Sequence, residues 1–310
     1  MGENSSQVYV PAAVSSFFEI CDREPDGSPI DDLLRVGSRG GGFVIKRGTI
    51  TRAALSERGT DQIIINGRKV TNARTTAKVV ESMRSKYHLG PIKIEHRIKP
   101  PIGYGFGTSG SGALGAAIAI SRLFGLQLTL AQASDFAHRA EIESVTGLGT
   151  VISLASGFGA VGLVTEPGSY ALGSVDSILV EDKSYALVCA CFGPIEKSTV
   201  LKQESARKRV NEVGHSTLES ILDNPSVENL LKQSRHFAEK SGIASASLLK
   251  LSDKAVELGA IGSTQNMIGN GIHALVRREK VTGFVKSFTK YAKGGSIFVS
   301  DLIHSGPVIR

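Results

Sequence analysis

The sequence predicts an α+β fold divided between two domains, and three observations lead to that prediction. The chain has 310 residues, about twice the ~150 residues used as a prior for one domain. With 41% hydrophobic and 21% charged residues, it can bury a core of useful size. Strand and helix patterns mix in both halves without strict alternation, which favours α+β over a doubly wound sheet. We place the boundary near residue 180, giving domains 1–180 and 181–310.

The first domain is predicted to begin with β structure and to continue with helices. Strands are expected at residues 8–10, 17–20, 43–46, 63–65, 92–98 and 160–164, where β-branched and aromatic residues gather or apolar and polar residues alternate. Helices are expected at residues 71–87, 113–124 and 129–143. Thr129 and Gln132 have the spacing of a capping box at the start of the third helix.

The second domain is predicted to open with a strand at residues 186–191 and to close with one at 296–299. Helices are expected between them at residues 199–213, 226–237 and 244–258. Cys189 and Cys191 alternate along the first of these strands. Together with Cys21 they are expected to be buried free thiols, because a metal or redox site would need more ligands nearby.

Composition and charge exclude several classes of protein. The net charge of +7 raises the question of nucleic acid, but the basic residues are scattered and only 6% of residues are aromatic, with no tryptophan. An excess of positive charge also suits an enzyme whose substrates are anionic. No apolar run approaches the ~18 residues of a membrane helix. The first residues lack the pattern of a secretory leader, so we expect a cytoplasmic protein.

The segment of residues 105–112 carries the strongest chemical signal. It lies between the expected strand 92–98 and an apolar helix, where glycines allow close approach of a ligand and the amides of the first helical turn attract anions. Its hydroxyls can bind phosphate oxygens or a magnesium ion, so the segment predicts a triphosphate site. The expected binding residues are Gly105, Gly107, Thr108, Ser109, Gly110, Ser111 and Gly112.

Two common phosphate-binding motifs do not describe this segment. The Walker motif requires a lysine directly after its glycines, and none follows here. A Gly-X-Gly-X-X-Gly pattern is present from Gly105 to Gly110, but prolines precede it and no acidic residue follows on a second strand. The nucleotide site is therefore expected to be of another kind.

At this point the sequence resembles the GHMP kinases, a superfamily of small-molecule kinases. The segment from Pro101 to Gly110 looks like their second motif, Pro-X-X-X-Gly-Leu-Gly-Ser-Ser-Ala. Other segments resemble the archaeal pantoate kinases within that superfamily, and the likeness spans nearly the whole chain. These segments are residues 10–18, the Gly-Ser-Arg-Gly-Gly-Gly block at 37–42 with Arg47-Gly48, residues 140–149, and residues 297–301.

The resemblance implies the two-domain GHMP kinase fold, with an N-terminal domain like domain 2 of ribosomal protein S5 and a ferredoxin-like C-terminal domain. It implies ATP and Mg²⁺ as cofactors, with ATP bound in the cleft. The implied reaction moves the γ-phosphoryl group of ATP to the 4-hydroxyl of (R)-pantoate for coenzyme A synthesis. Pantoate is then the small-molecule partner, and a homodimer is expected, without nucleic acid or membrane.

The resemblance also implies roles for individual residues. Ser109 matches the family serine that contacts phosphate and magnesium, and Glu141 matches the acidic magnesium ligand, with Glu143 as its rival. Thr150 stands where many relatives have an aspartate that acts as base or anchor, so the base is in doubt. Because phosphoryl transfer has a loose transition state, the loss of a base need not abolish turnover. Ala13 stands where several relatives have a basic residue.

The substrate carboxylate is expected to meet Ser38 and Arg39, because a guanidinium fork matches a carboxylate with two parallel hydrogen bonds. A surface arginine in a loop is the alternative. Residues 263–271 take the place of the third superfamily motif, a turn that shapes the cleft from the second domain. His138 and His273 are interpreted as structural histidines, since the histidines form no cluster with the spacing of a zinc site.

Three alternatives to a pantoate kinase stay open at this stage. The chain can be a GHMP kinase of another small hydroxy acid or alcohol, of the homoserine, shikimate or mevalonate type, since the phosphate loop does not identify the acceptor. It can also be a non-catalytic relative that has kept the nucleotide cleft, which Thr150 would favour. The third alternative is nucleic-acid binding through the net positive charge, and it predicts an affinity for nucleic acid that falls steeply with salt concentration.

Overall fold

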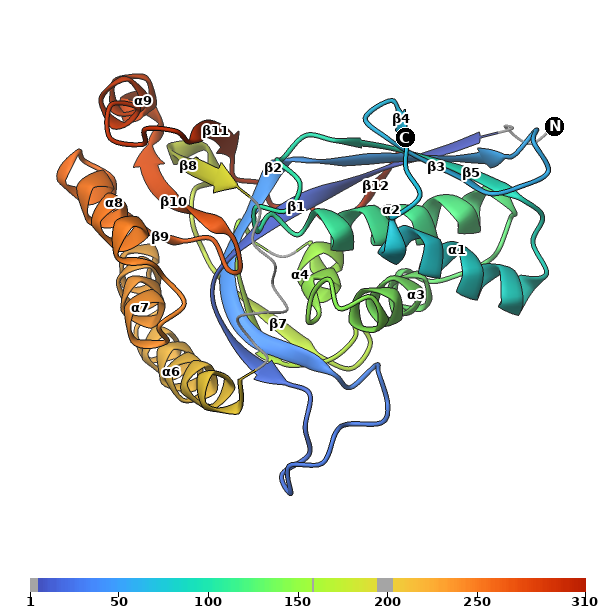
Figure 1. The fold of residues 1–310 in the computed structure, drawn as a ribbon, viewed down its shortest axis with the longest axis horizontal. Helices are drawn as coiled ribbons and strands as arrows, with labels where there is room; N and C mark the ends of the chain where they lie inside the picture. The colour runs from blue at the N-terminus through green and yellow to red at the C-terminus, as the bar shows by residue number, and fades with distance from the viewer. Residues whose placement is uncertain (1–4, 158, 194–202) are drawn as a thin grey trace.

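The protein is known from a computed structural model that describes residues 5–157, 159–193 and 203–310. Two β-sheets form its framework, and helices pack against both (Figure 1). An eight-stranded sheet carries most of the first half of the chain, and a four-stranded sheet carries the second half. The expected mixed α and β architecture is confirmed.

The larger sheet is built around two long antiparallel strands, β1 (Ser5–Cys21) and β2 (Gly37–Leu55). Its strand order is β12-β1-β2-β5-β3-β4, with β6 pairing β2 and β7 pairing β6. Among the strand pairs of the described residues in this sheet, only β3 and β5 run parallel. The remaining bounds are β3 Gln62–Ile65, β4 Arg68–Lys69, β5 Ile92–Ile98, β6 Val161–Glu166, β7 Ser174–Ile178 and β12 Val308–Ile309.

Two glycines in β2 explain how the neighbouring strands come so close. A Cβ on Gly42 would lie 2.0 Å from the carbonyl oxygen of Val14, and one on Gly41 would lie 2.5 Å from the Leu163 side chain. The sequence predicted that the glycine block at residues 37–42 admits a ligand, with a loop position as the alternative for Arg39. The block is part of a strand and not a loop, and its glycines admit the backbone of β1 and the side chains of β6. That the block also admits a ligand stays a prediction.

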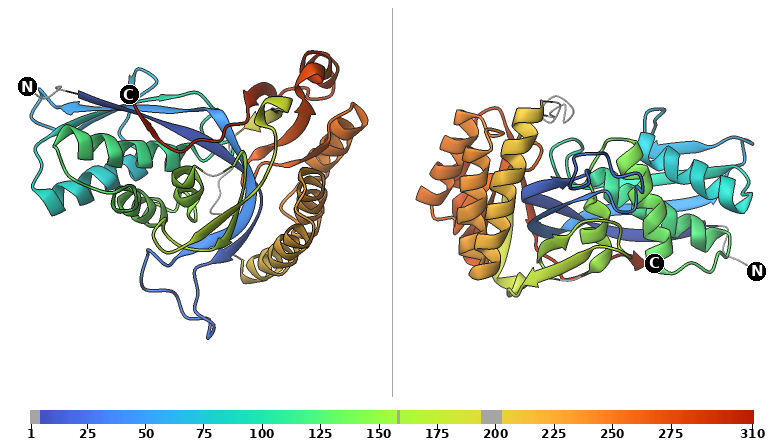
Figure 2. Two further views of the ribbon diagram at one scale, coloured as in Figure 1. Left: turned by 180° about the vertical axis from the view of Figure 1, so that it is seen from behind. Right: turned by 90° about the horizontal axis from the view of Figure 1, so that it is seen from below.

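Four helices cover one face of the larger sheet, as both ribbon views show (Figures 1 and 2). The central one is α2, whose alanines and isoleucines are almost completely buried among the strands and the other helices. Small side chains on α2 let it pack closely on β1 and β2. The bounds are α1 Arg74–Tyr87, α2 Thr108–Leu123, α3 Leu130–Glu143 and α4 Thr150–Ser156.

The second sheet has the strand order β11-β8-β10-β9, and all its described pairs are antiparallel. Helices α6, α7 and α8 lie side by side next to it (Figure 2, right). The first four residues of the helix expected at 199–213 lie outside the described residues. The bounds are β8 Tyr185–Gly193, α6 Glu204–Asp223, α7 Val227–Lys240, α8 Ala246–Glu257, β9 Gly262–Gln265, β10 Asn270–Arg277, α9 Val281–Phe288 and β11 Ser296–Asp301.

Several contacts connect the two sheets. Bridges join Ser15 to Met267 and Ile45 to Leu302, and one hydrophobic cluster contains residues of β1, β2, β8, α6 and α7. After β11 the chain returns to the larger sheet, where β12 pairs with β1. The last residues of the chain therefore lie beside the first ones, in the larger sheet. The domain boundary near residue 180 stays a prediction.

Local expectations from the sequence had mixed outcomes. The capping box at Thr129 and Gln132 is confirmed by both of its hydrogen bonds. The helix expected to start at residue 113 begins at Thr108, so most of the glycine-rich segment is helical. Strands β4, β7, β9, β10 and β12 and helices α4 and α9 were not predicted. Cys189 and Cys191 are buried free thiols as expected, whereas Cys21 is half-buried.

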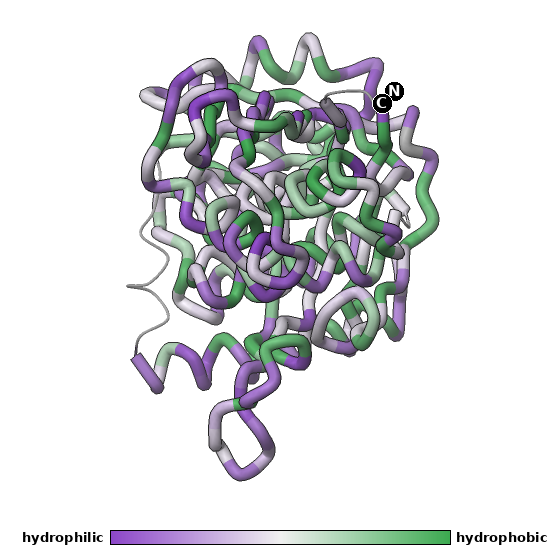
Figure 3. The backbone as a smooth tube through the Cα atoms, turned by 90° about the vertical axis from the view of Figure 1, so that its right-hand side faces the viewer, coloured by the Kyte–Doolittle hydropathy of each residue, from purple (hydrophilic) through white to green (hydrophobic). Residues whose placement is uncertain are grey.

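Hydrophobic segments lie mainly inside the fold, and hydrophilic ones follow the outer turns and helix ends (Figure 3). Burial raises the pKa of the Cys191 thiol to about 12, so that group stays protonated in the core. No helix within the described ranges has the length and apolar character needed to cross a membrane.

Candidate active site

The glycine-rich segment leads directly into α2. Gly107 is the residue before the helix and has a φ of 60°, a left-handed conformation that glycine adopts without strain. A Cβ at this position would lie 2.7 Å from Cγ2 of Thr150. The amides of Thr108, Ser109 and Gly110 then form the first helical turn, where backbone N–H groups have no partner within the helix. This arrangement suits an anion.

The three hydroxyls of this segment occupy different environments. Ser111 is fully buried, and its Oγ lies 2.8 Å from Oγ1 of Thr49 and donates to the carbonyl oxygen of Thr108. Thr108 is also buried, whereas Ser109 is half-buried. Ser109 is therefore the hydroxyl of this turn that is best placed to meet a ligand. Binding by all three stays a prediction.

The second domain supports the segment from the other side. Asn266, in the turn between β9 and β10, donates from Nδ2 to the carbonyl oxygen of Tyr104 over 3.1 Å. In the same turn, a Cβ on Gly269 would lie 2.5 Å from that carbonyl oxygen. Ala13 of β1 donates its N–H to the carbonyl oxygen of Phe106. Residues 263–271 thus touch the glycine-rich segment, which is where the sequence analysis expected them to act.

A buried polar chain fixes the Asn266 side chain. Its Oδ1 lies 2.9 Å from Nδ1 of His273, and the other ring nitrogen lies 2.9 Å from Oγ of Ser16. Burial lowers the pKa of His273 to about 3, so the ring is neutral near pH 7. His273 therefore has the structural role expected for it. His138 is also fully buried and donates from Nε2 to backbone carbonyls of Leu33 and Val36.

The structure separates the two candidate metal carboxylates. Glu141 has no exposed surface, and its Oε1 lies 3.1 Å from the position that a Cβ on Gly110 would take. Its Oε2 accepts a hydrogen bond from the Val151 N–H over 3.4 Å. Glu143 points elsewhere: its side chain is 41% exposed and lies 3.6 Å from Nζ of Lys78. Only Glu141 adjoins the first turn of α2.

These residues fit a magnesium ion by donor chemistry. One carboxylate and the Ser109 hydroxyl supply the hard oxygen ligands that Mg²⁺ prefers, and Mg²⁺ commonly takes its remaining ligands from water and substrate phosphates. A metal site made of protein ligands alone would need several such side chains close together. The described residues contain no group of three or more His, Cys, Asp or Glu side chains that could hold a metal.

A cleft adjoins the glycine-rich segment at Thr150. Thr150 is the first residue of α4 and lies close to two glycines of the segment. A Cβ on Gly107 would lie 2.7 Å from Cγ2 of Thr150, and a Cβ on Gly110 would lie 3.3 Å from Cβ of Thr150. Apolar side chains line much of the cleft, and the arginine of the Gly-Ser-Arg block is the charged group among its described lining residues. The lining residues that matter here are Val14, Phe17, Ser38, Arg39, Phe43, Thr150 and Val164.

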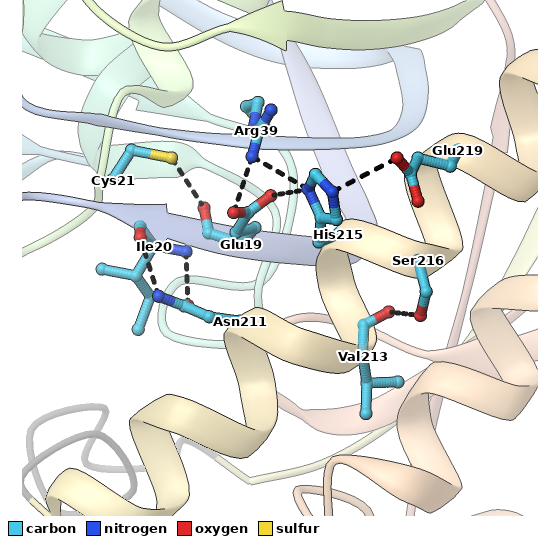
Figure 4. A network of polar contacts seen from close by, with 9 residues as sticks. All are labelled: Glu19, Ile20, Cys21, Arg39, Asn211, Val213, His215, Ser216 and Glu219. Carbon is cyan, nitrogen blue, oxygen red and sulfur yellow. Dashed lines mark hydrogen bonds and ion pairs between the residues drawn. The ribbon is translucent and has the colours of Figure 1, made fainter. Parts of the chain in front are cut away.

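Arg39 lies in this cleft and is held by an ion pair. Its Nη2 donates to Oε1 of Glu19 over 2.7 Å, and Glu19 raises the pKa of the guanidinium, chiefly through this hydrogen bond (Figure 4). Ser38 donates its hydroxyl to the carbonyl oxygen of Leu148, just before α4. Ser38, Arg39 and Thr150 all line this cleft. The side chains of Ser38 and Arg39 have different partners, since Ser38 bonds Leu148 before α4 whereas Arg39 bonds Glu19 of β1 and lies beside His215 of α6. The substrate clamp stays a prediction.

Sequence reasoning missed Glu19, His215 and Thr49, which support the site residues. Glu19 and Arg39 are paired directly across β1 and β2. A carboxylate in the middle of an apolar strand was a usable signal, because buried charges need partners. Finding that partner requires the register of the hairpin, which the sequence does not display. Thr49 and His215 gave no signal of their own.

Comparisons with known proteins add a separate line of observation. Residues 74–157 match the model of the GHMP kinases N terminal domain. The chain is 31% identical to the pantoate kinase of Thermococcus kodakarensis over 88% of both chains, and 28% identical to that of Methanocaldococcus jannaschii over 88% of this chain and 93% of the relative. A solved phosphotransferase related to the coenzyme A biosynthesis pathway is 26% identical, with a TM-score of 0.86 over 99% of this chain and 98% of that one.

Proposed function

We infer the function from one premise: the chain belongs to the pantoate kinase family of the GHMP kinases. It is an enzyme that phosphorylates (R)-pantoate with ATP, giving 4-phosphopantoate for coenzyme A biosynthesis. Its relatives are pantoate kinases over most of their length, so a homoserine, shikimate or mevalonate kinase is not favoured. The observation that carries the proposal is the packing of the glycine-rich turn: Gly110 lies against Glu141 and Thr150, and Thr150 lines the cleft.

We propose that the glycine-rich segment of residues 105–112 holds the phosphates of ATP. Phosphoryl transfer depends mainly on positioning and on neutralising charge, which backbone amides and a helix N-terminus can do. Ser109 and Glu141 would hold Mg²⁺, which neutralises charge on the phosphate oxygens when bound. Gly107 and Gly110 support this assignment, because side chains there would fill the space beside Glu141 and Thr150.

We propose that pantoate occupies the cleft between Thr150 and Arg39. The guanidinium pairs with its carboxylate, Ser38 lies next to that clamp, and the apolar lining suits the two methyl groups of the substrate. The hydroxyl that receives the phosphoryl group then points toward Thr150 and the glycine-rich segment. A threonine is no base near neutral pH, so Thr150 orients the hydroxyl and the loose transition state requires little prior deprotonation.

The finer fold assignment also belongs to this proposal. The order β11-β8-β10-β9, with helices between β8 and β9 and between β10 and β11, is the arrangement of a ferredoxin-like domain. The larger sheet with α1–α4 corresponds to the domain like ribosomal protein S5. A cytoplasmic homodimer is the expected state, which cell fractionation and light scattering after size-exclusion chromatography would test.

The test of the function is an ADP-release assay with (R)-pantoate, homoserine, shikimate and mevalonate as acceptors. We expect turnover with pantoate alone and a product identified by mass spectrometry and ³¹P NMR as the 4-phosphate. ATP binding without turnover of any acceptor would identify a non-catalytic relative. In the same assay Arg39→Ala is expected to raise the KM for pantoate, and an unchanged KM would remove the clamp.

A further inference from the structure

One terminal nitrogen of the Arg39 guanidinium, Nη2, has two protein partners. Besides donating to Glu19, Nη2 lies 3.0 Å from Nδ1 of His215 (Figure 4). An arginine Nη carries two hydrogens. Glu19 takes one and His215 takes the other, so Nη2 has no hydrogen left for a substrate.

This contact is a hydrogen bond only when Nδ1 of His215 is the acceptor. Arg39 has no acceptor, so Nδ1 of His215 must accept and therefore carries no proton. The proton of the neutral ring is then on Nε2, which lies 3.3 Å from Oε1 of Glu219 and can donate to it. The three groups form a chain in which Arg39 donates to His215 and His215 donates to Glu219.

The neutral histidine competes with a carboxylate substrate. A guanidinium can donate two parallel hydrogen bonds to a carboxylate along either of two edges. One edge is formed by Nε and Nη2, and the other by Nη1 and Nη2. Both edges use Nη2, where His215 occupies a hydrogen. A substrate carboxylate can receive two parallel hydrogen bonds from Arg39 only after His215 gives up its contact.

Protonation of the ring would end the competition. A protonated imidazole donates from both nitrogens, so Nδ1 could no longer accept from Arg39. Glu19 provides the alternative partner: its Oε2 lies 3.5 Å from Nδ1 of His215 and has no hydrogen bond to any described residue. The side chain of Glu19 is only 13% exposed, so water screens this pair weakly. The hydrogen released from His215 is then available on Nη2.

The other titratable groups around the ring do not offer the same switch. Burial and the nearby Glu19 carboxylate raise the pKa of Cys21, so its thiol stays protonated from pH 6 to 8. On α6 itself, Glu212 pairs with Lys208 on the exposed surface. Helix α7 also packs on α6, and its described residues form no ion pair with His215.

We propose that His215 is a positioning residue of the substrate clamp: the neutral ring occupies one Nη2 hydrogen of Arg39, and the protonated ring releases it to the carboxylate of pantoate. The proposal rests on the proposed role of Arg39 in binding that carboxylate. It places a proton-controlled step in substrate affinity on α6 of the second domain.

The experiment measures the KM for pantoate from pH 6 to pH 8 at saturating ATP and Mg²⁺. For the native protein we expect the KM to be about fivefold lower at pH 6 than at pH 8, the size of one net hydrogen bond. His215→Ala is expected to keep the low KM at every pH. His215→Asn retains an acceptor near the place of Nδ1 but does not titrate, so it is expected to keep the high KM at every pH.

A matched control separates this role from general effects of pH. His236 is an exposed histidine on α7, and His236→Ala is expected to follow the native pH profile. The changes should fall on KM much more than on kcat. If His215→Ala and His215→Asn both follow the native profile, or if both raise the KM at pH 8, the role of His215 is wrong. If Arg39→Ala leaves the KM unchanged, the clamp itself is wrong.

Discussion

Replacing Glu141 by glutamine tests the metal site, because it removes one charge and preserves the shape of the side chain. Glu141 has no exposed surface and adjoins the first turns of both α2 and α4, through Gly110 and the Val151 N–H. No other described carboxylate of the residue 140–149 segment reaches that place. A neutral side chain there would leave the phosphate charge poorly compensated during transfer.

The expected loss is large in turnover and small in stability. Removing one group that stabilises charge in a transition state commonly costs about 10²–10³ in kcat. We therefore expect Glu141→Gln to lower kcat by about 10²-fold and to raise the Mg²⁺ concentration needed for half-maximal activity. Glu143→Gln is the matched control. Its carboxylate pairs with Lys78 in an exposed ion pair worth about 0–1 kcal/mol, so turnover should stay within about twofold.

The assay is ADP release at saturating pantoate and ATP, with Mg²⁺ varied, beside a thermal unfolding scan of each variant. The scan separates a catalytic effect from a loss of folded protein. The reasoning would be refuted if Glu141→Gln kept its turnover and Mg²⁺ dependence within about threefold, or if Glu143→Gln carried the loss instead.

Three further predictions concern the backbone and the buried histidines. Val145, 75% exposed, has a φ of 54°, so Val145→Gly should raise the unfolding free energy by about 1 kcal/mol in urea titrations. Gly107→Ala should lower kcat/KM for ATP by about 10²-fold, whereas Gly27→Ala, in open space at a φ of 86°, should not. Burial lowers the pKa of His96 to about 4 and of His273 to about 3, below the unfolded value near 6.5. The unfolded state thus binds more protons as pH falls from about 6.5 to 4, and urea midpoints should show stability falling by up to about 1.4 kcal/mol per pH unit for each histidine.

The phosphate-binding segment could be predicted from the sequence because its chemistry is local. Glycines that alternate with hydroxyl residues directly before an apolar helix are typical of an anion-binding turn, and the segment does begin α2. The start of that helix was misjudged by five residues. Glycine, serine and threonine are poor helix formers in isolation, and here Ser111 is stabilised in the helix by tertiary contact with Thr49, which no local pattern reveals.

The substrate side of the site was harder to predict because it depends on strand register. Arg39 was identified by residue type and by resemblance, but its surroundings follow from the pairing of β1 with β2 and from the packing of α6 on β1. Asn211 on α6 bonds both backbone groups of Ile20 (Figure 4), which places His215, one turn later, beside Glu19. Three segments meet there, and Ile20 and Asn211 are 191 positions apart in the chain.

Strands β1 and β2 explain why phosphate binding and substrate binding can be coordinated in this fold. β1 supports the glycine-rich segment through Ala13, supports the β9–β10 turn through Ser15 and Ser16, and holds the clamp through Glu19. These contacts lie within seven consecutive residues of one strand. A shift of β1 along β2 would therefore displace the phosphate site and the clamp together, and the glycines of β2 keep the two strands too close for such a shift to occur without a steric clash.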